Sequence, residues 1–89
     1  MDIKRELLEQ IEIVIKKLEM EYADEIKSGV MKLIYIRYMN ALDILKNNKD
    51  INQFNIIGGV RAYMDSYNDY NNPLLGELHK AEKLNKQLI

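Results

Sequence analysis

The sequence predicts an all-α fold, an antiparallel bundle of four helices within a single helical domain of residues 1–89. Proline occurs once and glycine four times, so few residues interrupt a helix. Long straight side chains dominate, and apolar residues recur at helical spacing in four stretches separated by polar or glycine-containing turns. We expect helices at about 2–27, 30–47, 52–70 and 73–88. The alternative for the first two is one continuous helix through Gly29.

The first segment carries one broad apolar face. Its members are Leu8, Ile11, Ile15, Leu18 and Tyr22. This pattern ends where Glu25 takes the next position, short of the roughly three to four heptads that a coiled coil needs. Ser28 and Gly29 then fit a helix end, because glycine readily adopts the left-handed conformation common at C-terminal caps.

The second segment is apolar almost all the way round, which is typical of a central helix. One face holds Val30, Ile34, Tyr38, Ala41 and Leu45, and Leu33, Ile36, Met39 and Ile44 widen it. The polar stretch KNNKD at 46–50 ends the segment. Either Asp50 or Asn52 fits the N-cap of the third helix.

The third segment ends in AYMDSYNDYNNP, residues 62–73, which combines tyrosines with aspartates. On a helical wheel Tyr63, Tyr67 and Tyr70 fall with the apolar residues, so we expect core packing, with an aromatic pocket lining as the alternative. The fourth segment starts at Asn72 and Pro73, as N-cap and first helical residue. Its apolar stripe is Leu74, Leu78, Ala81, Leu84 and Leu88.

The other face of the third segment carries a stripe that we predict to bind a partner. The stripe consists of Gly58, Ala62, Asp65 and Asp69. Two adjacent glycines inside a helix cost about 1 kcal/mol each, so we expect either a close approach of another helix there, which we favour, or a break in the helix. For the aspartates the alternative is a solvated face, with Arg61 within reach of Asp65.

The residues needed for catalysis or metal binding do not form a recognisable pattern. There is no cysteine, and the serines, Ser28 and Ser66, have no histidine nearby in sequence. The Asp65–Gly76 stretch lacks the glycine and glutamate of a calcium loop. His79 and Glu82 are one turn apart, but a surface histidine is the commoner interpretation. We expect no enzyme activity, no catalytic residue, no metal and no cofactor.

Charge and hydropathy restrict the partners. The net charge of -1 and the absence of a basic recognition helix argue against nucleic acid. No apolar run approaches about 18 residues, so we expect neither a signal peptide nor membrane association, and a cytoplasmic location. We expect a protein partner, because surplus apolar surface and the stripe of the third segment accompany the lack of a catalytic cluster.

Surplus apolar residues on the first two segments predict an oligomer interface. They are Ile13, Met20, Ile36 and Met39. Two adjacent helices that each carry such a pair are expected to form a contiguous surface and a homodimer. The alternative is that these four side chains belong to the core.

The stretches GGVRAYMDSYNDY and NPLLGELHKAEKL resemble the C-terminal half of some small bacterial helical proteins of immunity or toxin-neutralising type. The resemblance covers about residues 56–84 and implies a compact inhibitor that acts by binding, through positions Gly58, Gly59, Asn68 and Asp69. We therefore predict a non-enzymatic protein-binding module. The alternatives are a regulatory or structural homodimer and a small-molecule or metal binder.

Overall fold

Helices make up nearly all of the chain that the computed structural model describes, which is residues 3–47, 56, 58–66 and 73–88. The elements are α1 (Ile3–Glu21), the short 3-10 helix η1 (Glu25–Lys27), α2 (Gly29–Lys46), α3 (Gly59–Ser66) and α4 (Pro73–Leu88). No strand occurs in the described residues. The predicted all-α class is confirmed.

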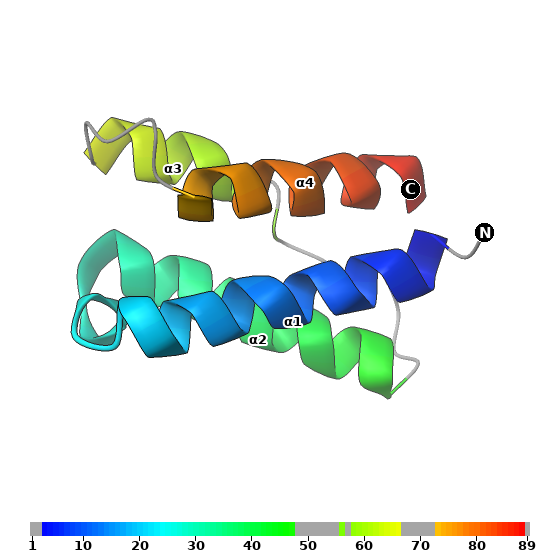
Figure 1. Cartoon of the computed structure of the whole chain (residues 1–89), viewed down its shortest axis with the longest axis horizontal. Coiled ribbons are helices and arrows are strands. Elements are labelled where there is room, and N and C mark those ends of the chain that lie inside the picture. The colour runs from blue at the N-terminus through cyan, green and yellow to red at the C-terminus, as the bar shows by residue number, and fades with distance from the viewer. Residues whose placement is uncertain (1–2, 48–55, 57, 67–72, 89) are drawn as a thin grey trace.

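The helices form two layers, with α1 and α2 in one and α3 and α4 in the other (Figure 1). Helix α1 packs against α2 and α4, and α3 packs against the same two helices. Each helix runs antiparallel to the neighbours it contacts, so the first turn of α1 and the last turn of α4 lie at the same end of the molecule (Figure 1). The predicted antiparallel bundle of four helices is therefore confirmed.

The predicted extension of the first helix to residue 27 is wrong, because α1 ends at Glu21 and the chain turns before η1. The last turn of α1 contains no basic residue, and Asp24 and Glu25 follow it. Acidic groups at a helix C-terminus oppose its dipole, which accounts for the early end. A continuous helix through Gly29 is also excluded. Gly29 adopts the expected left-handed conformation, with φ of 68°, at the first residue of α2.

The core is built from all four helices. Its buried members include Leu7, Ile11, Leu18, Met31, Ile34, Tyr38, Ile56, Tyr63, Leu74 and Leu78. Tyr63 confirms the inward direction predicted for the tyrosine face, while Tyr67 and Tyr70 lie outside the described residues. Met64, placed by the wheel in the same arc, is 38% exposed instead.

The predicted unbroken helix over 52–70 is wrong at the glycine pair. Gly58 has φ of 102°, and α3 begins only at Gly59. The Gly58 carbonyl accepts a hydrogen bond from Ala62 N at 2.9 Å, and Gly59 N donates to Ile56 O at 3.2 Å. The pair therefore starts the helix, which is the break that we considered less favoured. The predicted cap at Asp50 or Asn52 lies outside the described residues.

Helix α4 starts at Pro73, as predicted from the fixed backbone angle of proline. The predicted cap residue Asn72 lies outside the described residues. The inner face buries Leu75 and Asn85 in addition to the predicted Leu74, Leu78 and Ala81, and Leu84 is only partly buried. None of the described helices is both long and apolar enough to cross a membrane.

Candidate functional site

A carboxylate from α4 anchors the start of α3. Glu82 Oε2 accepts a hydrogen bond from Val60 N at 2.8 Å, and Oε1 accepts one from Gly58 N at 3.3 Å. The first amides of a helix have no partner within the helix, and Gly58 has no side chain to supply one. A negative charge is also favourable at this end of the helix dipole. Glu82 therefore caps α3 from a neighbouring helix and fixes α3 against α4.

A buried tyrosine lies beneath this anchor. Tyr38 on α2 is fully buried, and its Cε1 would lie 3.9 Å from a Cβ added at Gly59. Burial raises the pKa of the Tyr38 phenol, and the negative charge of Glu82 adds to the effect. Within the described structure the hydroxyl has no hydrogen-bond partner, and the same holds for Asn85 Oδ1. The phenol is thus held neutral and unpaired under α3.

The outer faces of α3 and α4 enclose an open groove of about 690 Å³. Its lining residues are Val60, Arg61, Met64, Asp65, His79, Lys80, Glu82, Lys83 and Lys86. Val60 is buried and Met64 is 38% exposed, whereas the charged Arg61 and Asp65 of the same helix are exposed. The groove consequently has an apolar floor on the α3 side and a charged rim.

Positive charge dominates this rim. Four of the lining side chains are cations, namely Arg61, Lys80, Lys83 and Lys86. Only Asp65 and Glu82 are acidic, and the Glu82 carboxylate is directed at the α3 backbone. Across the described chain, none of the four cations takes part in an ion pair, so the Arg61–Asp65 contact considered with the solvated-face alternative is not formed. The groove is therefore cationic on a chain whose net charge is -1.

The structure places the described residues of the predicted partner-binding stripe in different surroundings. Gly58 is the residue directly before α3, and its amide donates to Glu82 inside the molecule. Ala62 is half-buried. Asp65 is exposed in the cationic groove, and Asp69 lies outside the described residues. The resemblance position Asn68 also lies outside them, while Gly59 is buried against Glu82. Among the described residues of the predicted stripe, Asp65 is therefore the exposed one.

The four predicted interface residues are exposed, which excludes their assignment to the core. The exposed fractions are 47% for Ile13, 72% for Met20, 44% for Ile36 and 40% for Met39. They nevertheless belong to separate surfaces.

The two apolar pairs point in different directions. Ile13 and Met20 line a shallow hollow of about 430 Å³ together with Pro73 and Glu77 of α4. The side of α1 that faces α2 is marked by Glu19, which accepts a hydrogen bond from Tyr35. This side is more than about 90° away on the wheel from Ile13 and Met20. The expected contiguous surface over α1 and α2 is therefore wrong.

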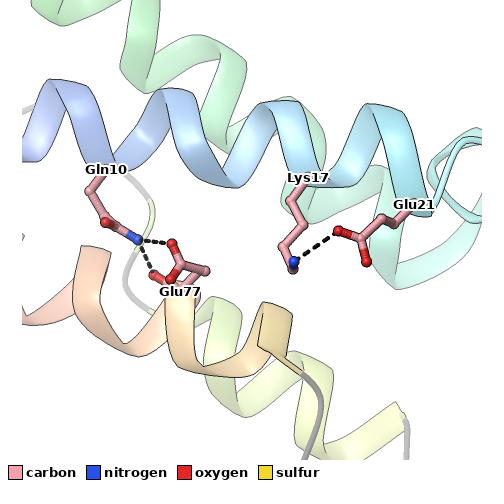
Figure 2. A network of polar contacts seen from close by, with 4 residues as sticks. All are labelled: Gln10, Lys17, Glu21 and Glu77. Atoms are coloured by element: carbon pink, nitrogen blue, oxygen red, sulfur yellow. Dashed lines mark hydrogen bonds and ion pairs between the residues drawn. The ribbon is translucent and has the colours of Figure 1, made fainter.

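A polar contact that the sequence patterns did not predict joins α1 to α4 (Figure 2). Gln10 is 2% exposed, and its Nε2 donates to Glu77 Oε2 at 2.9 Å and to the Glu77 backbone oxygen at 3.0 Å. Farther along α1, Lys17 and Glu21 form an ion pair at 2.8 Å (Figure 2). In the sequence, Gln10 lies beside the apolar face of the first segment and not within it, so the apolar pattern gave no signal for this contact.

Groups that could bind a metal ion are not found among the described residues, where no cluster of three histidine, cysteine, aspartate or glutamate side chains occurs. His79 is exposed and lies in the groove. Glu82, its neighbour one turn away, is bonded to the α3 amides. The described residues therefore form a groove with a cationic rim.

Comparison with known proteins places the chain in a family. Residues 1–89 match the family described as "YeeD uncharacterised protein", and the chain belongs to this family. A relative from Bacillus subtilis (strain 168), "Uncharacterized protein YeeD", is 32% identical over 98 aligned positions, which cover 98% of this chain and 93% of the relative. This finding supports the resemblance to small bacterial proteins. No solved structure gives a significant match.

Proposed function

We propose that this member of the YeeD family is a non-enzymatic protein-binding module that uses the groove between α3 and α4. The observation that carries the proposal is the groove itself, an apolar floor inside a rim with four cations. Apolar area supplies binding free energy, whereas a charged rim selects the partner and speeds encounter. The Glu82 anchor supports a preformed site, because it fixes α3 before any partner arrives.

A binding role fits the groove side chains better than a catalytic one. The described lining residues include lysines, an arginine, an exposed histidine and two carboxylates, and none of them is a serine, threonine or cysteine that a base could activate. Arginine and methionine, both present here, are enriched at protein interfaces. The proposal therefore includes no cofactor and no chemical step.

Within this class, we propose an inhibitor or immunity-type protein that acts in the cytoplasm. The support is the resemblance of residues 56–84 to small bacterial proteins of that type, together with the bacterial relative. A toxin or secretion gene next to the coding gene would strengthen this proposal. A conserved neighbourhood of unrelated metabolic genes would count against it.

Site-specific photo-crosslinking in the native host tests the binding function. A photoreactive amino acid replaces Arg61 in the groove, and the matched control replaces exposed Glu12 on α1, outside the groove and outside the apolar face of α2. We expect an adduct with one different protein at position 61 and none at position 12. The adduct should decrease when Lys83→Glu and Lys86→Glu are added. If neither position gives an adduct, or both give the same one, the groove is not the binding site.

A homodimer is the second candidate, supported by the exposed apolar residues Leu33, Ile36 and Met39 on the outward face of α2. Light scattering coupled to size-exclusion chromatography measures the mass. We expect Ile36→Glu with Met39→Glu to convert a dimer to a monomer, and Ile13→Glu with Met20→Glu to leave it intact. A wild-type monomer at high concentration would remove this candidate.

A further inference from the structure

The groove between α3 and α4 is positively charged, whereas the whole chain has a negative net charge. The whole chain has a net charge of -1, whereas cations outnumber acids two to one in the groove lining. Glu82 directs its carboxylate to the α3 backbone, which leaves Asp65 as the acid of the outer rim. Because like charges across an interface are unfavourable, the groove selects a partner segment with carboxylates.

The shape of the groove indicates the form of that segment. Two antiparallel helices that present their i, i+3 and i+4 positions form a furrow into which a third helix can pack, as in helix-in-groove recognition. Val60 and Met64 provide apolar contacts from α3. The methylene chains of Lys83 and Lys86 can cover apolar groups from the α4 side while their ammonium groups remain in water.

The dimensions set the length and spacing of the contact. The α4 positions that line the groove run from His79 to Lys86, which is about 10 Å at 1.5 Å per residue. That length matches about two turns of a bound helix. Arg61 stands on the α3 rim, and Lys80 and Lys83 stand on the α4 rim. A helix seated between the rims would meet cations along both of its edges.

We propose that the α3–α4 groove binds an amphipathic helix of a partner protein, with a stripe of apolar residues facing Val60 and Met64 and carboxylates on both flanks. This inference rests on the proposed protein-binding function and specifies the chemistry of the partner. Nucleic acid is a less suitable ligand than an acidic helix. The groove offers only four cations to a phosphate backbone, and the chain as a whole is acidic, with a sequence pI of about 5.8.

Synthetic peptides test this chemistry directly. The probe is a fluorescein-labelled helical peptide of about 18 residues, with leucines at spacings of three and four and glutamates on both flanks. One matched peptide carries lysine in place of every glutamate, and a second has the acidic composition in scrambled order. Fluorescence anisotropy gives the Kd, and amide chemical-shift changes locate the contact. We expect the acidic amphipathic peptide alone to bind, to shift residues 60–65 and 79–86, and to weaken as salt increases.

Charge reversal distinguishes the groove from general electrostatic attraction. The groove variant is Arg61→Glu with Lys83→Glu, and the control is Lys16→Glu with Lys32→Glu on the exposed surfaces of α1 and α2. Circular dichroism verifies that both variants fold. We expect the groove variant to raise the Kd at least about tenfold, which is about 1.4 kcal/mol, and the control to change it less than about twofold.

Several outcomes would overturn the inference. These are equal binding of the lysine peptide, equal losses in the two variants, shifts confined to α1 and α2, or tighter binding of single-stranded DNA of similar length. The proposed function is judged separately. If the crosslink at position 61 captures a protein but the acidic peptide does not bind, the acidic helix is excluded and the protein-binding function stands. If both experiments fail, both proposals are wrong.

Discussion

Helix α4 forms two unlike contacts, one with α1 and one with α3. On the α1 side, Glu77 accepts a hydrogen bond from the side-chain amide of Gln10, and α1 and α4 are both long helices (Figure 2). On the α3 side, Glu82 accepts hydrogen bonds from two backbone amides, and it lines the open groove. Two glutamates of α4, five positions apart, therefore have different structural roles. Glu77 links α4 to a side chain of α1, whereas Glu82 caps the N-terminus of α3.

The two contacts show how each helix is stabilised. The nineteen residues of α1 bury an extended apolar face of their own. The described α3 has eight residues, below the roughly 12–15 at which isolated helices become even marginally stable. Helix α3 depends on contacts with α2 and α4, and its position sets the width of the groove. The α3–α4 contact is thus the place where stability and proposed binding are linked.

Removing the Glu82 carboxylate should destabilise the protein more than any other single change considered. Glu82→Ala leaves the amides of Gly58 and Val60 without their acceptor. Hydrogen bonds to charged groups contribute about 1.5–3 kcal/mol each, and partial exposure of Glu82 reduces the sum, so we expect a loss of about 3 kcal/mol in the free energy of unfolding. Urea denaturation measures it.

The matched control for this loss is Glu77→Ala on the same helix. It should cost about 1 kcal/mol, because the Glu77 backbone oxygen still accepts from Gln10. Glu82→Gln should fall between the two alanine variants, since its amide oxygen can still accept a bond but carries no charge. Equal losses in the two alanine variants would remove the distinction between the α1 and α3 contacts.

The glycines provide a second test of the α3 start. Gly58 has φ of 102°, which alanine adopts only with strain, so Gly58→Ala should cost about 2 kcal/mol. Gly76 lies in α4 and has open space where a methyl group would project, so Gly76→Ala should instead stabilise by about 0.5–1 kcal/mol. Thermal unfolding compares them. A neutral Gly58→Ala would show that the α3 start tolerates another backbone conformation.

Tyr38 predicts a dependence on alkaline pH. Its folded pKa is raised by burial, whereas the phenol of the unfolded chain titrates near its usual value of about 10. The stability from this group is present below about pH 10 and is lost as pH increases further. We expect the wild type to lose about 1.4 kcal/mol more than Tyr38→Phe between about pH 9 and pH 11, as measured by urea denaturation. The hydrogen bond to Glu19 also raises the pKa of Tyr35, but at an exposed site, so Tyr35→Phe is the comparison variant and should remove a smaller part of the pH dependence than Tyr38→Phe. Parallel pH curves for wild type and Tyr38→Phe would contradict the prediction.

The contrast between the two contacts also explains what the sequence could predict. The apolar periodicity of α1, α2 and α4 depends on local spacing, so their number, order and buried faces followed from the sequence. The structural roles of Gly29 and Pro73 could also be predicted from local sequence, because each position requires a backbone conformation that its residue adopts readily.

The start of α3 could not be predicted in the same way, because its cap comes from a residue more than twenty positions away. The predicted helix continued through Gly58. On that helix Gly58, Ala62 and Asp65 shared one face, and this alignment was the basis of the predicted stripe. The useful signal was an absence: no aspartate, asparagine, serine or threonine directly precedes Gly59, so the first amides needed a distant acceptor. Three of the four groove cations lie on α4, whereas Arg61 and Asp65 lie on α3, so only the tertiary fold reveals the groove.

The weakest response is expected at the α1–α4 contact. Gln10→Leu removes the buried amide and its two hydrogen bonds. Glu77 is only partly buried, so water can replace the lost donor, and the leucine adds apolar burial beside Leu7 and Ile11. We expect the free energy of unfolding to change by less than about 0.5 kcal/mol in urea denaturation. A loss as large as that of Glu82→Ala would mean that the α1 contact also depends on its buried hydrogen bonds. The two sides of α4 would then be alike in energy, and the groove would owe its position to the whole bundle rather than to the Glu82 cap.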